Sequence, residues 1–584
     1  MSHVSATPRK PSSDEHGAAP GHVRMASTGL PSTPAYSATR RHSLYGTEDR
    51  IVLDPGTFVW KIGFSGESRP RDVLYAGTLL TRAVCKSFDM AHTVVERDED
   101  ERMLEVLLQD RLRSVFFESL LTDPKSRKII VVEHPLMPLS VKETLARILF
   151  NNLQVPSLSF VSSHLLALLA VGRISGLVID CGYFETTCLP IFSSRPLYPH
   201  LQTTPLAGMR LSAHLKALLL LFGTWLPPPT TLGGPANAPA TSRTTSVPEE
   251  VLTEVLLEEI KTRCCFVAQP LASQNQHTLE DADMMAVDDE PPPRDYLPSE
   301  SLRDDSLPPS SSPMPSSDLS EIPVAPIPTS DGTKVKQTRL QAMANFYLKH
   351  STATNISLAA IPPVAQRYST GRGTLVVPGW VRERAAEVLF EGGDVDESSV
   401  AEIILDALLK TPVDLRKLMA TSIVVNGGTA MLPGFIPRLQ QELLKRLEPP
   451  YRSESGAKRK TARRIYDPYA ALRPLGPFIS VLNNPVPEPN AARAGKAPAF
   501  APAILSWLGG SLAGALKTGG EEISRERWDE ADIEQEIAED AAEAESEAIG
   551  RVRQGGSVLP DWTRNPLPVG APSAFVTPPV VVMS

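Results

Sequence analysis

The sequence predicts a two-lobed α/β protein. Its 584 residues are too many for one compact core. Apolar, β-branched strands alternate with helical patterns from Arg50 onward, as in α/β folds. One strand-and-turn unit also occurs twice. Residues 51–53 are an apolar run that ends at Asp54-Pro55-Gly56, and residues 177–179 are a similar run that ends at Asp180-Cys181-Gly182. We expect one copy of this hairpin in each lobe.

The repeated hairpins have the chemistry of phosphate loops. A tight turn after a buried strand directs backbone N–H groups outward, where they can bind phosphate oxygens. Asp54 and Asp180, at the strand ends, could each hold the water shell of Mg²⁺. Asn426-Gly427-Gly428-Thr429 is a third glycine turn, where backbone can approach a ligand closely. The alternative is that all three are ordinary turns, since Asp and Gly are common turn residues.

Charge, cysteine content and missing motifs disfavour several classes of protein. A net charge of −9 gives no footprint for nucleic acid, so we expect no direct nucleic-acid partner. The five cysteines form no CxxC pair, which disfavours a zinc site or disulfide framework and indicates a reducing compartment. The motifs GxxxxGK[ST], HExxH and GxSxG are absent. His134 and His164 lack an obvious catalytic partner, so we interpret both as packed side chains.

Composition also divides the chain into segments. Residues 1–48 contain no apolar stretch, so we expect a disordered tail without a signal peptide. Residues 211–226 contain His214 and Lys216 and predict a buried helix rather than a membrane contact. The remaining expected segments are a first lobe over 49–171, a second lobe over 172–449 with disordered insertions at 223–248 and 268–336, an insertion over 450–500, a segment over 501–530 that returns to the first lobe, and an acidic helix with a Pro-rich tail over 531–584.

Apolar periodicity and capping signals predict the elements in order. In the first lobe we expect a helix over 101–121, a buried strand over 128–132, and a helix over 162–171 that ends at Gly172. A helix over 140–151 should begin at Ser140, with Glu143 completing a capping box. In the second lobe we expect helices over 249–267, 398–409, 412–419 and 433–447 and a strand over 422–425. In the segment that returns to the first lobe we expect a last helix from 507 to 517.

Taken in order from Arg50 to Asp529, the motifs resemble the actin superfamily. The resemblance implies the two-lobed fold of actin, Hsp70-type chaperones and sugar kinases, with duplicated β-hairpin phosphate loops and a reduced second subdomain near 78–100. The segments that carry it are Asp54-Pro55-Gly56-Thr57 with 61–66, Glu133-His134-Pro135-Leu136, 172–176 with Asp180-Cys181-Gly182, Leu206-Ala207-Gly208, 259–261 with 265–268, 426–434, and Trp507-Leu508-Gly509-Gly510-Ser511.

The resemblance also implies a nucleotide site that would hold ATP or ADP with Mg²⁺. The implied phosphate contacts are Gly56, Thr57, Lys61 and Gly182, the metal-side carboxylates are Asp54 and Asp180, and the sugar or base contacts are Lys261, Gly427, Gly428 and Met431. We expect any bound nucleotide to be structural rather than turned over.

Departures from the actin pattern support that expectation. Phe58 replaces a small glycine and would crowd the phosphate side, while Tyr183 and Phe184 replace an Asp-Gly pair. The position of the water-orienting glutamine holds Ser163, whose hydroxyl is too short for that role. Four further positions differ from the actin pattern: Thr187 stands for a histidine near the attacking water, Thr262 for an acidic ribose contact, Leu432 for an aromatic residue and Ala503 for a lysine. Losing one group that stabilises a transition state typically lowers the rate about 10²–10³-fold, so we expect no efficient ATPase.

The segment between Pro70 and Glu133 is shorter than in actins and lacks their DNase-binding loop, so we expect a non-polymerising scaffold. Residues 466–469, 475–484, 507–517 and 523–526 most resemble the fungal class of actin-related protein ten. That class would cap the pointed end of the dynactin filament, with other actin-related and pointed-end subunits as partners, in dynein-driven transport on microtubules in the cytoplasm.

Two alternatives remain. A nuclear subunit of a chromatin-remodelling complex would explain the acidic insertions and the basic cluster at 458–464, which otherwise predicts a solvated loop. An active actin-like ATPase is the other, and the replacements in the phosphate loops speak against it.

Overall fold

The computed structural model describes residues 50–76, 94–228, 245–270, 341, 344–364, 371–392, 397–449, 467–485, 500–531 and 559–560. These residues form two compact units. Of the described residues, unit 1 contains those up to Ala170 and those from Ser506 onward, and unit 2 contains those from Val171 to Leu505. The expected tail over 1–48, the basic cluster at 458–464, Cys85 and most of the acidic helix and tail over 531–584 lie outside the described residues.

Unit 1 is built on a six-stranded sheet with the order β14-β5-β4-β1-β2-β3. β1 runs parallel to β4, and β4 runs parallel to β5, whereas the other pairs are antiparallel. The strands are β1 (Ile51–Pro55), β2 (Val59–Phe64), β3 (Asp72–Tyr75), β4 (Ile129–Glu133), β5 (Ser157–Ser162) and β14 (Ile523–Ser524).

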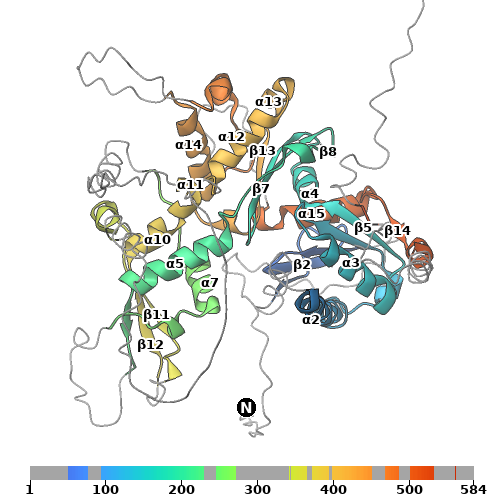
Figure 1. Ribbon diagram of the computed structural model, residues 1–584, viewed down its shortest axis with the longest axis horizontal. Helices are drawn as coiled ribbons and strands as arrows, with labels where there is room; N and C mark the ends of the chain where they lie inside the picture. The colour runs from blue at the N-terminus through green and yellow to red at the C-terminus, as the bar shows by residue number, and fades with distance from the viewer. Residues whose placement is uncertain are drawn as a thin grey trace, which may run out of the picture. The chain divides into compact units, whose positions relative to one another are not determined.

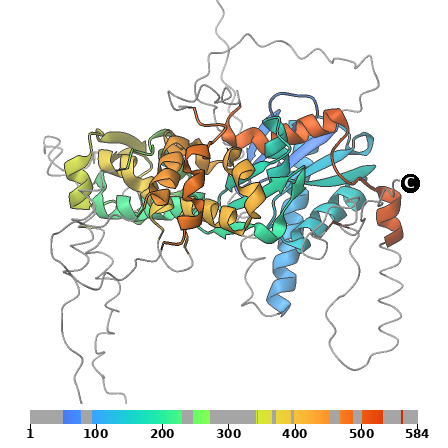
Figure 2. The same cartoon turned by 90° about the horizontal axis from the view of Figure 1, so that it is seen from above.

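Helices cover both faces of this sheet, as Figures 1 and 2 show. Ile51 and Leu53 point into a core with α2 (Val94–Ser114) and α3 (Leu139–Arg147), whereas Val52 between them packs with α4 (Ser163–Ala170) and α15 (Leu505–Leu516). This alternation is the period of two expected of a strand buried on both faces. The shorter helical turns of unit 1 are η1 (Val115–Ser119), η2 (Pro124–Ser126) and η3 (Ile148–Asn152).

Unit 2 contains two sheets. The five-stranded sheet has the order β13-β6-β7-β8, with β9 also paired to β7, and the three-stranded sheet has the order β10-β12-β11. Its strands are β6 (Gly176–Cys181), β7 (Thr186–Phe192), β8 (Arg195–Pro196), β9 (Gln202–Thr204), β10 (Thr224–Leu226), β11 (Ile356–Ala360), β12 (Gly373–Val377) and β13 (Ile423–Asn426).

The helices of unit 2 pack around one large apolar core. They are α5 (Gly208–Phe222), α7 (Glu254–Arg263), α10 (Gly379–Arg384), α11 (Val388–Glu391), α12 (Val400–Lys410), α13 (Val413–Ala420) and α14 (Phe435–Leu447). The shorter turns are η4 (Tyr198–His200), η5 (Glu249–Val251), η7 (Ala385–Glu387), η8 (Thr429–Met431), η9 (Ala470–Phe478) and η10 (Pro502–Ile504). Among the described residues no helix combines the length and the apolarity that crossing a bilayer requires.

Several element predictions need correction. The capping box at Ser140 is wrong, because α3 begins at Leu139 after Pro138 and no side chain caps it. Pro138 has extended backbone angles, so the chain enters the helix one residue earlier than expected. The helix predicted over 249–267 is instead η5 followed by α7, which Thr253 caps by accepting a hydrogen bond from the N–H of Leu256.

Two of the expected insertions contain regular structure. β10 lies within 223–248 and pairs with β12. η9 lies within 450–500, and Val481 after it makes a parallel bridge to Ile423 of β13. These segments read as loops in the sequence because their pairing partners lie far away along the chain.

Candidate functional site

In unit 1 the predicted site residues Asp54, Gly56, Thr57 and Lys61 all lie on the β1–β2 hairpin. The strand register places Asp54 opposite Lys61, and the Nζ–Oδ2 distance is 2.7 Å. The Gly56 N–H donates to the carbonyl of Asp54 at 3.0 Å. A Cβ on Gly56 would lie 2.5 Å from the carbonyl oxygen of Val59, so the turn admits only glycine.

The Phe58 side chain belongs to the packing of unit 1. It is 8 % exposed, and its ring meets Tyr75 of β3 edge-on with the ring centroids 4.7 Å apart. The N–H of Ala76 also donates to the carbonyl of Phe58 at 2.9 Å. The residue expected to crowd a phosphate therefore also joins β3 to the hairpin.

Ser163, which the sequence resemblance places where a water-orienting glutamine is expected, packs into the interior of unit 1. The residue is 4 % exposed, and its Oγ lies 3.1 Å from Nδ1 of His164. His164 is fully buried, and its ring centroid lies 5.9 Å from that of His134. The Ser163 carbonyl accepts a hydrogen bond from the hydroxyl of Ser506 at 3.1 Å. His164 is thus packed in the interior of unit 1, whereas His134 is half-buried.

In unit 2 the ends of two parallel strands bring Asp180 and Gly427 together. The register pairs Asp180 of β6 with Asn426 of β13, and the carboxyl ends of neighbouring parallel strands are a common place for ligands. Gly427 has φ +102°, and a Cβ there would lie 2.2 Å from the Cys181 carbonyl oxygen and 2.7 Å from Asp180 Oδ1. Only glycine lets the backbone come this close to the Asp180 carboxylate.

Gly182 connects the second hairpin to two other elements. Its N–H donates to the carbonyl of Glu185 at 3.1 Å, which closes the turn. Its carbonyl accepts from the Gly208 N–H at 3.2 Å, at the start of α5, and from the Thr429 hydroxyl at 2.7 Å, in η8. The loop is therefore fixed to both of these helical turns.

Lys261 reaches this loop from α7. It is 7 % exposed, and its Nζ lies 2.5 Å from a Glu258 carboxylate oxygen and 3.0 Å from the Ser212 hydroxyl oxygen. The same Nζ lies 5.6 Å from the centre of the Tyr183 ring, and the Tyr183 and Phe184 ring centroids are 5.5 Å apart. Lys261 thus contacts an aromatic ring at the second hairpin.

Sequence reasoning missed the residues that hold Lys261. Glu258 lies three positions before Lys261 on α7, a helical spacing that brings the two side chains together. Ser212 lies four positions after Gly208 in α5 and donates to the Gly208 carbonyl at 3.0 Å. The spacing of Glu258 was visible in the sequence, but the pairing of Ser212 with α7 needed the fold.

Gly428 and Met431 lie on the solvent side of the third turn. Gly428 is exposed, and a Cβ there would have no heavy atom within 4 Å. Met431 of η8 is 48 % exposed. Unit 2 therefore brings Asp180 and Gly427 together, ties Gly182 to Thr429 and places Lys261 beside Tyr183. Gly428 and Met431 face solvent.

The donor set fits a nucleotide-bound magnesium ion better than one held by protein alone. Within the described residues no group of three or more His, Cys, Asp or Glu side chains is placed to hold a metal. Asp54 in unit 1 and Asp180 in unit 2 are each 8–9 % exposed. Mg²⁺ usually keeps several waters and binds through one or two carboxylates plus phosphates, so each carboxylate suits a metal that arrives with a nucleotide.

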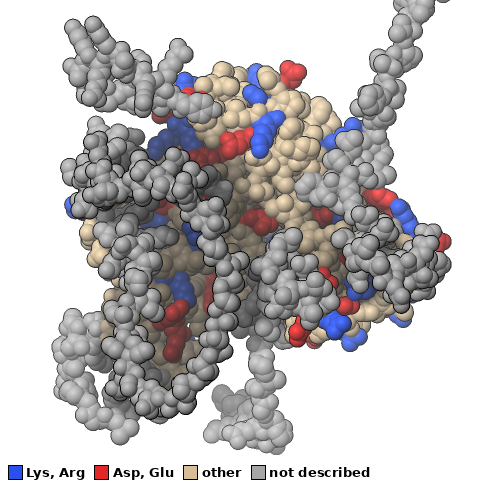
Figure 3. All heavy atoms as spheres, in the orientation of Figure 1, with Lys and Arg blue, Asp and Glu red and all other residues tan. Residues whose placement is uncertain are grey.

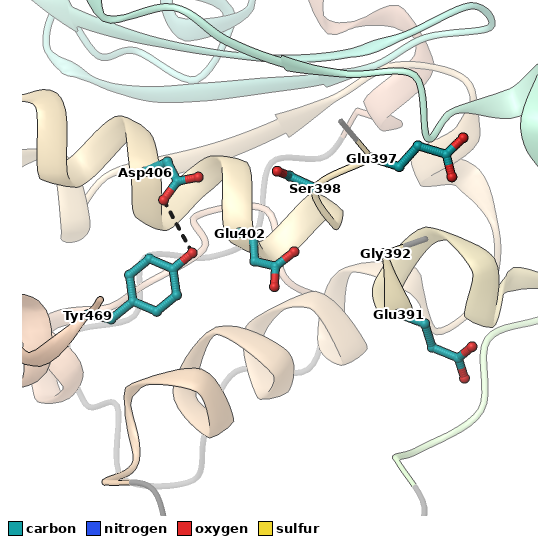
Figure 4. A pocket seen from close by; sticks show the side chains of 7 residues that line it. All are labelled: Glu391, Gly392, Glu397, Ser398, Glu402, Asp406 and Tyr469. Carbon is teal, nitrogen blue, oxygen red and sulfur yellow. Dashed lines mark hydrogen bonds between the residues drawn. The ribbon is translucent and has the colours of Figure 1, made fainter. Parts of the chain in front are cut away.

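A separate acidic pocket of about 450 Å³ lies in unit 2 and contains none of the predicted site residues (Figure 4). It is lined by Glu391, Gly392, Glu397, Ser398, Glu402, Asp406 and Tyr469. Its carboxylates have partners within the unit. Asp406 accepts from the Tyr469 hydroxyl at 3.2 Å, Glu391 accepts from Tyr347, Glu397 pairs with Arg210, and Glu402 accepts from the Ser399 N–H.

Pairing of opposite charges extends beyond this pocket. On the face drawn in Figure 3, Lys and Arg side chains lie near Asp and Glu side chains. Inside unit 2, Arg438 contacts Glu387 at 2.7 Å and Glu442 at 2.9 Å, with all three side chains at most 7 % exposed. These ions stabilise the fold and lie apart from the hairpins.

Comparison with known proteins places these features in a family. A family model described as Actin matches residues 46–470, which is more than half of the chain. Actin-related protein 2 of Acanthamoeba castellanii is 22 % identical over 421 residues, covering 68 % of this chain and 81 % of that protein.

Two further relatives match a shorter part of the chain. Actin-like protein 9 of Rattus norvegicus is 24 % identical over 219 residues, covering 32 % of this chain and 52 % of that protein. Actin-like protein 7A of Mus musculus is 25 % identical over 235 residues, covering 37 % of this chain and 48 % of that protein.

Proposed function

Since this chain belongs to the actin family and has the actin-like α/β fold, we propose that it is a non-polymerising scaffold subunit without efficient ATP hydrolysis. The three relatives named above are actin-related and actin-like proteins at 22–25 % identity, so the chain is a divergent actin-related protein. The proposal concerns what this divergence does to the nucleotide site and to assembly.

One observation carries the proposal of lost hydrolysis: Lys261 faces the ring of Tyr183 at 5.6 Å. In the resemblance to actins, Tyr183 stands where the second loop would have a carboxylate for the metal's water shell. The Tyr183 ring face attracts the Lys261 cation, but its neutral phenol oxygen is a weaker acceptor for metal-bound water than a charged carboxylate. The second loop therefore keeps Asp180 at its start and has the Tyr183 and Phe184 rings where the actin pattern has Asp-Gly.

The position that would orient the attacking water supports the same conclusion. The Ser163 hydroxyl is buried against His164, and the side chain is shorter than the amide it replaces. Hydrolysis requires a held water and stabilisation of developing charge, and each missing group lowers the rate about 10²–10³-fold. A turnover rate well below that of an actin follows from these two replacements together.

Nucleotide binding without turnover remains part of the proposal. In unit 1, Thr57 and Lys61 would contact phosphate and Asp54 a water of the magnesium ion. In unit 2, Asp180 would contact such a water, and Lys261 with the turn at Gly427 would contact the sugar or base. When bound, Mg²⁺ neutralises phosphate charge. Gly428 and Met431 are open to a base from the solvent side. A ligand that binds only the folded chain stabilises it by mass action, so nucleotide would act as a structural part.

For the assembly, we propose the pointed end of a dynactin filament in the cytoplasm, with other actin-related and pointed-end subunits as partners and dynein-driven transport as the process served. The support is the resemblance of residues 466–469 and 523–526 to the fungal class of actin-related protein ten. Residues 523–524 form β14, which pairs with β5 at the edge of the unit 1 sheet.

Two measurements test the proposal. The purified protein should release ADP or ATP on denaturation, seen by chromatography, yet turn over added ATP at least about 10²-fold more slowly than an actin. Turnover at actin-like rates would refute the loss of hydrolysis. A tagged chain should recover dynactin subunits from cytosol, and recovery of chromatin-remodelling subunits with nuclear fluorescence would favour the nuclear alternative instead.

A further inference from the structure

Leu559 and Pro560, near the C-terminal end of the chain, lie against unit 1. Leu559 is 3 % exposed and belongs to the apolar core formed by the sheet, α2 and α3. The carbonyl oxygen of Pro560 accepts a hydrogen bond from Nζ of Lys142. Leu559 and the carbonyl of Pro560 therefore both contact the N-terminal part of unit 1, and Pro560 lies 418 residues after Lys142.

Lys142 is a buried cation that this contact completes. It lies on α3 and is 2 % exposed. Its Nζ is 2.7 Å from a carboxylate oxygen of Glu133, at the end of β4, and 4.7 Å from the centre of the Phe160 ring in β5. An ammonium group has three N–H donors, and here a carboxylate, a ring face and the Pro560 carbonyl surround it.

We propose that unit 1 carries a recognition slot for a Leu-Pro segment, and that this chain's own Leu559-Pro560 occupies the slot in cis. The slot recognises two features of the segment: an apolar side chain that enters the core, and a carbonyl oxygen that accepts a hydrogen bond from the Lys142 ammonium. Proline suits the second position because it has no N–H to leave unpaired on burial, and its fixed φ lowers the entropy lost on binding. The proposal does not depend on nucleotide or on the identity of the assembly.

Because the chain's own segment fills the slot, any other Leu-Pro segment must displace it in order to bind. A segment tethered in the same chain competes at an effective concentration on the order of millimolar. A free peptide of the same sequence should therefore bind the intact chain weakly and should bind tightly once Leu559 no longer fills the slot. A partner that withdraws the C-terminal segment would expose a leucine-sized opening with a cation at its end.

The test uses the full-length chain and a fluorescent peptide of residues 553–565. The variant Leu559→Asp should bind the peptide at least about tenfold more tightly than the wild-type chain, because the tethered competitor is lost. Adding Lys142→Met should remove that gain. Leu516→Asp is the matched control, since Leu516 is a unit 1 leucine that is 58 % exposed, and it should bind as the wild type does.

Equal peptide binding by the wild type and Leu559→Asp would overturn the proposal, as would a gain that survives Lys142→Met. Reductive methylation of lysines, measured by mass spectrometry, shows whether a variant has unfolded. Lys142 should become at least about tenfold more reactive in Leu559→Asp, while Lys261, buried beside Glu258 in unit 2, should stay protected.

If both Lys142 and Lys261 become reactive, the aspartate has unfolded the chain, and the milder variant Leu559→Ala is tested instead. In that variant Lys142 should become reactive while Lys261 stays protected. Continued protection of Lys142 in a folded Leu559 variant would show that the C-terminal segment does not seal the slot.

Discussion

The carboxylate of Asp54 and the ammonium of Lys61 meet at 2.7 Å across the β1–β2 hairpin, with side chains 12 % and 17 % exposed. Each group is neutralised by the other within the hairpin. A nucleotide that placed phosphate on Lys61 and a hydrated metal on Asp54 would exchange this ion pair for two new charged contacts. The hairpin can therefore keep its shape with or without a ligand, as a structural role requires.

Removing one partner of this pair should destabilise unit 1. Lys61→Met leaves the Asp54 carboxylate largely buried without its cation, and we expect a loss of about 2–4 kcal/mol in unfolding free energy. Chemical denaturation measures it. Arg147→Met is the control, because its ion pair with Glu105 is 50 % and 32 % exposed and should contribute less than about 1 kcal/mol. Equal losses in the two variants would show that Asp54 is effectively solvated.

Restoring a carboxylate to the second loop should strengthen magnesium-dependent nucleotide binding. The double variant Tyr183→Asp with Phe184→Gly removes the ring that faces Lys261 and adds an acceptor for metal-bound water. One hydrogen bond to a charged group contributes about 1.5–3 kcal/mol, so affinity for a fluorescent ADP should rise about tenfold or more with Mg²⁺ present. Tyr183→Phe keeps a ring and should bind like the wild type. A gain independent of Mg²⁺ would contradict the assigned role.

The two hairpins could be predicted because their signals are local. A β-branched run that ends at Asp-x-Gly specifies a strand and its turn within a few residues, and the structure has β1–β2 and β6–β7 there. The strand that leads to Asn426 could be predicted equally well from its apolar residues, and β13 lies there. Gly427 behaves as a glycine turn should, with a positive φ against the backbone of the neighbouring strand.

Long-range pairing was not predictable from the same signals. β10 lies in a Thr- and Pro-rich segment and becomes a strand only by pairing with β12, whose residues follow much later. The contact of Lys261 with Ser212 joins two helices whose relative placement no local pattern specifies. Leu559 lies in a segment expected to be a Pro-rich tail, yet its side chain is buried in unit 1.

The third glycine turn offers a matched pair of substitutions. Gly427→Ala forces a Cβ within 2.2 Å of the Cys181 carbonyl oxygen at φ +102°, so we expect a loss of about 2 kcal/mol or more in unfolding free energy. Gly428→Ala meets no heavy atom within 4 Å and should change stability by less than about 0.5 kcal/mol. Thermal and chemical denaturation of both variants compare them directly. Similar losses would mean that the turn relaxes without strain.

The buried ions of unit 2 should contribute far more than exposed ones. Arg438→Met leaves Glu387 with Arg384 and Glu442 with Arg446 as the remaining cations, and we expect a loss of up to about 3–5 kcal/mol. Arg263→Met removes an ion pair with Glu259 that is 51 % and 44 % exposed, and its loss should stay below about 1 kcal/mol. Denaturation in low and high salt separates the two cases, because salt screens only the exposed pair effectively. A salt-sensitive loss at Arg438 would contradict its burial.

His214 should make the stability of unit 2 sensitive to acid. Burial, together with the nearby Arg210 cation, lowers the pKa of His214 from 6.5 to about 4. Between these values the unfolded chain binds a proton that the folded chain does not, so stability that is present above pH 6.5 is lost as the pH falls toward 4. His214→Gln cannot titrate, and its unfolding free energy should fall less steeply over this range, by up to about 1.4 kcal/mol per pH unit. Urea denaturation at a series of pH values measures both slopes. Arg210→Met should raise the pKa of His214 and weaken the acid sensitivity in part, and identical slopes in all three proteins would place the responsible groups elsewhere.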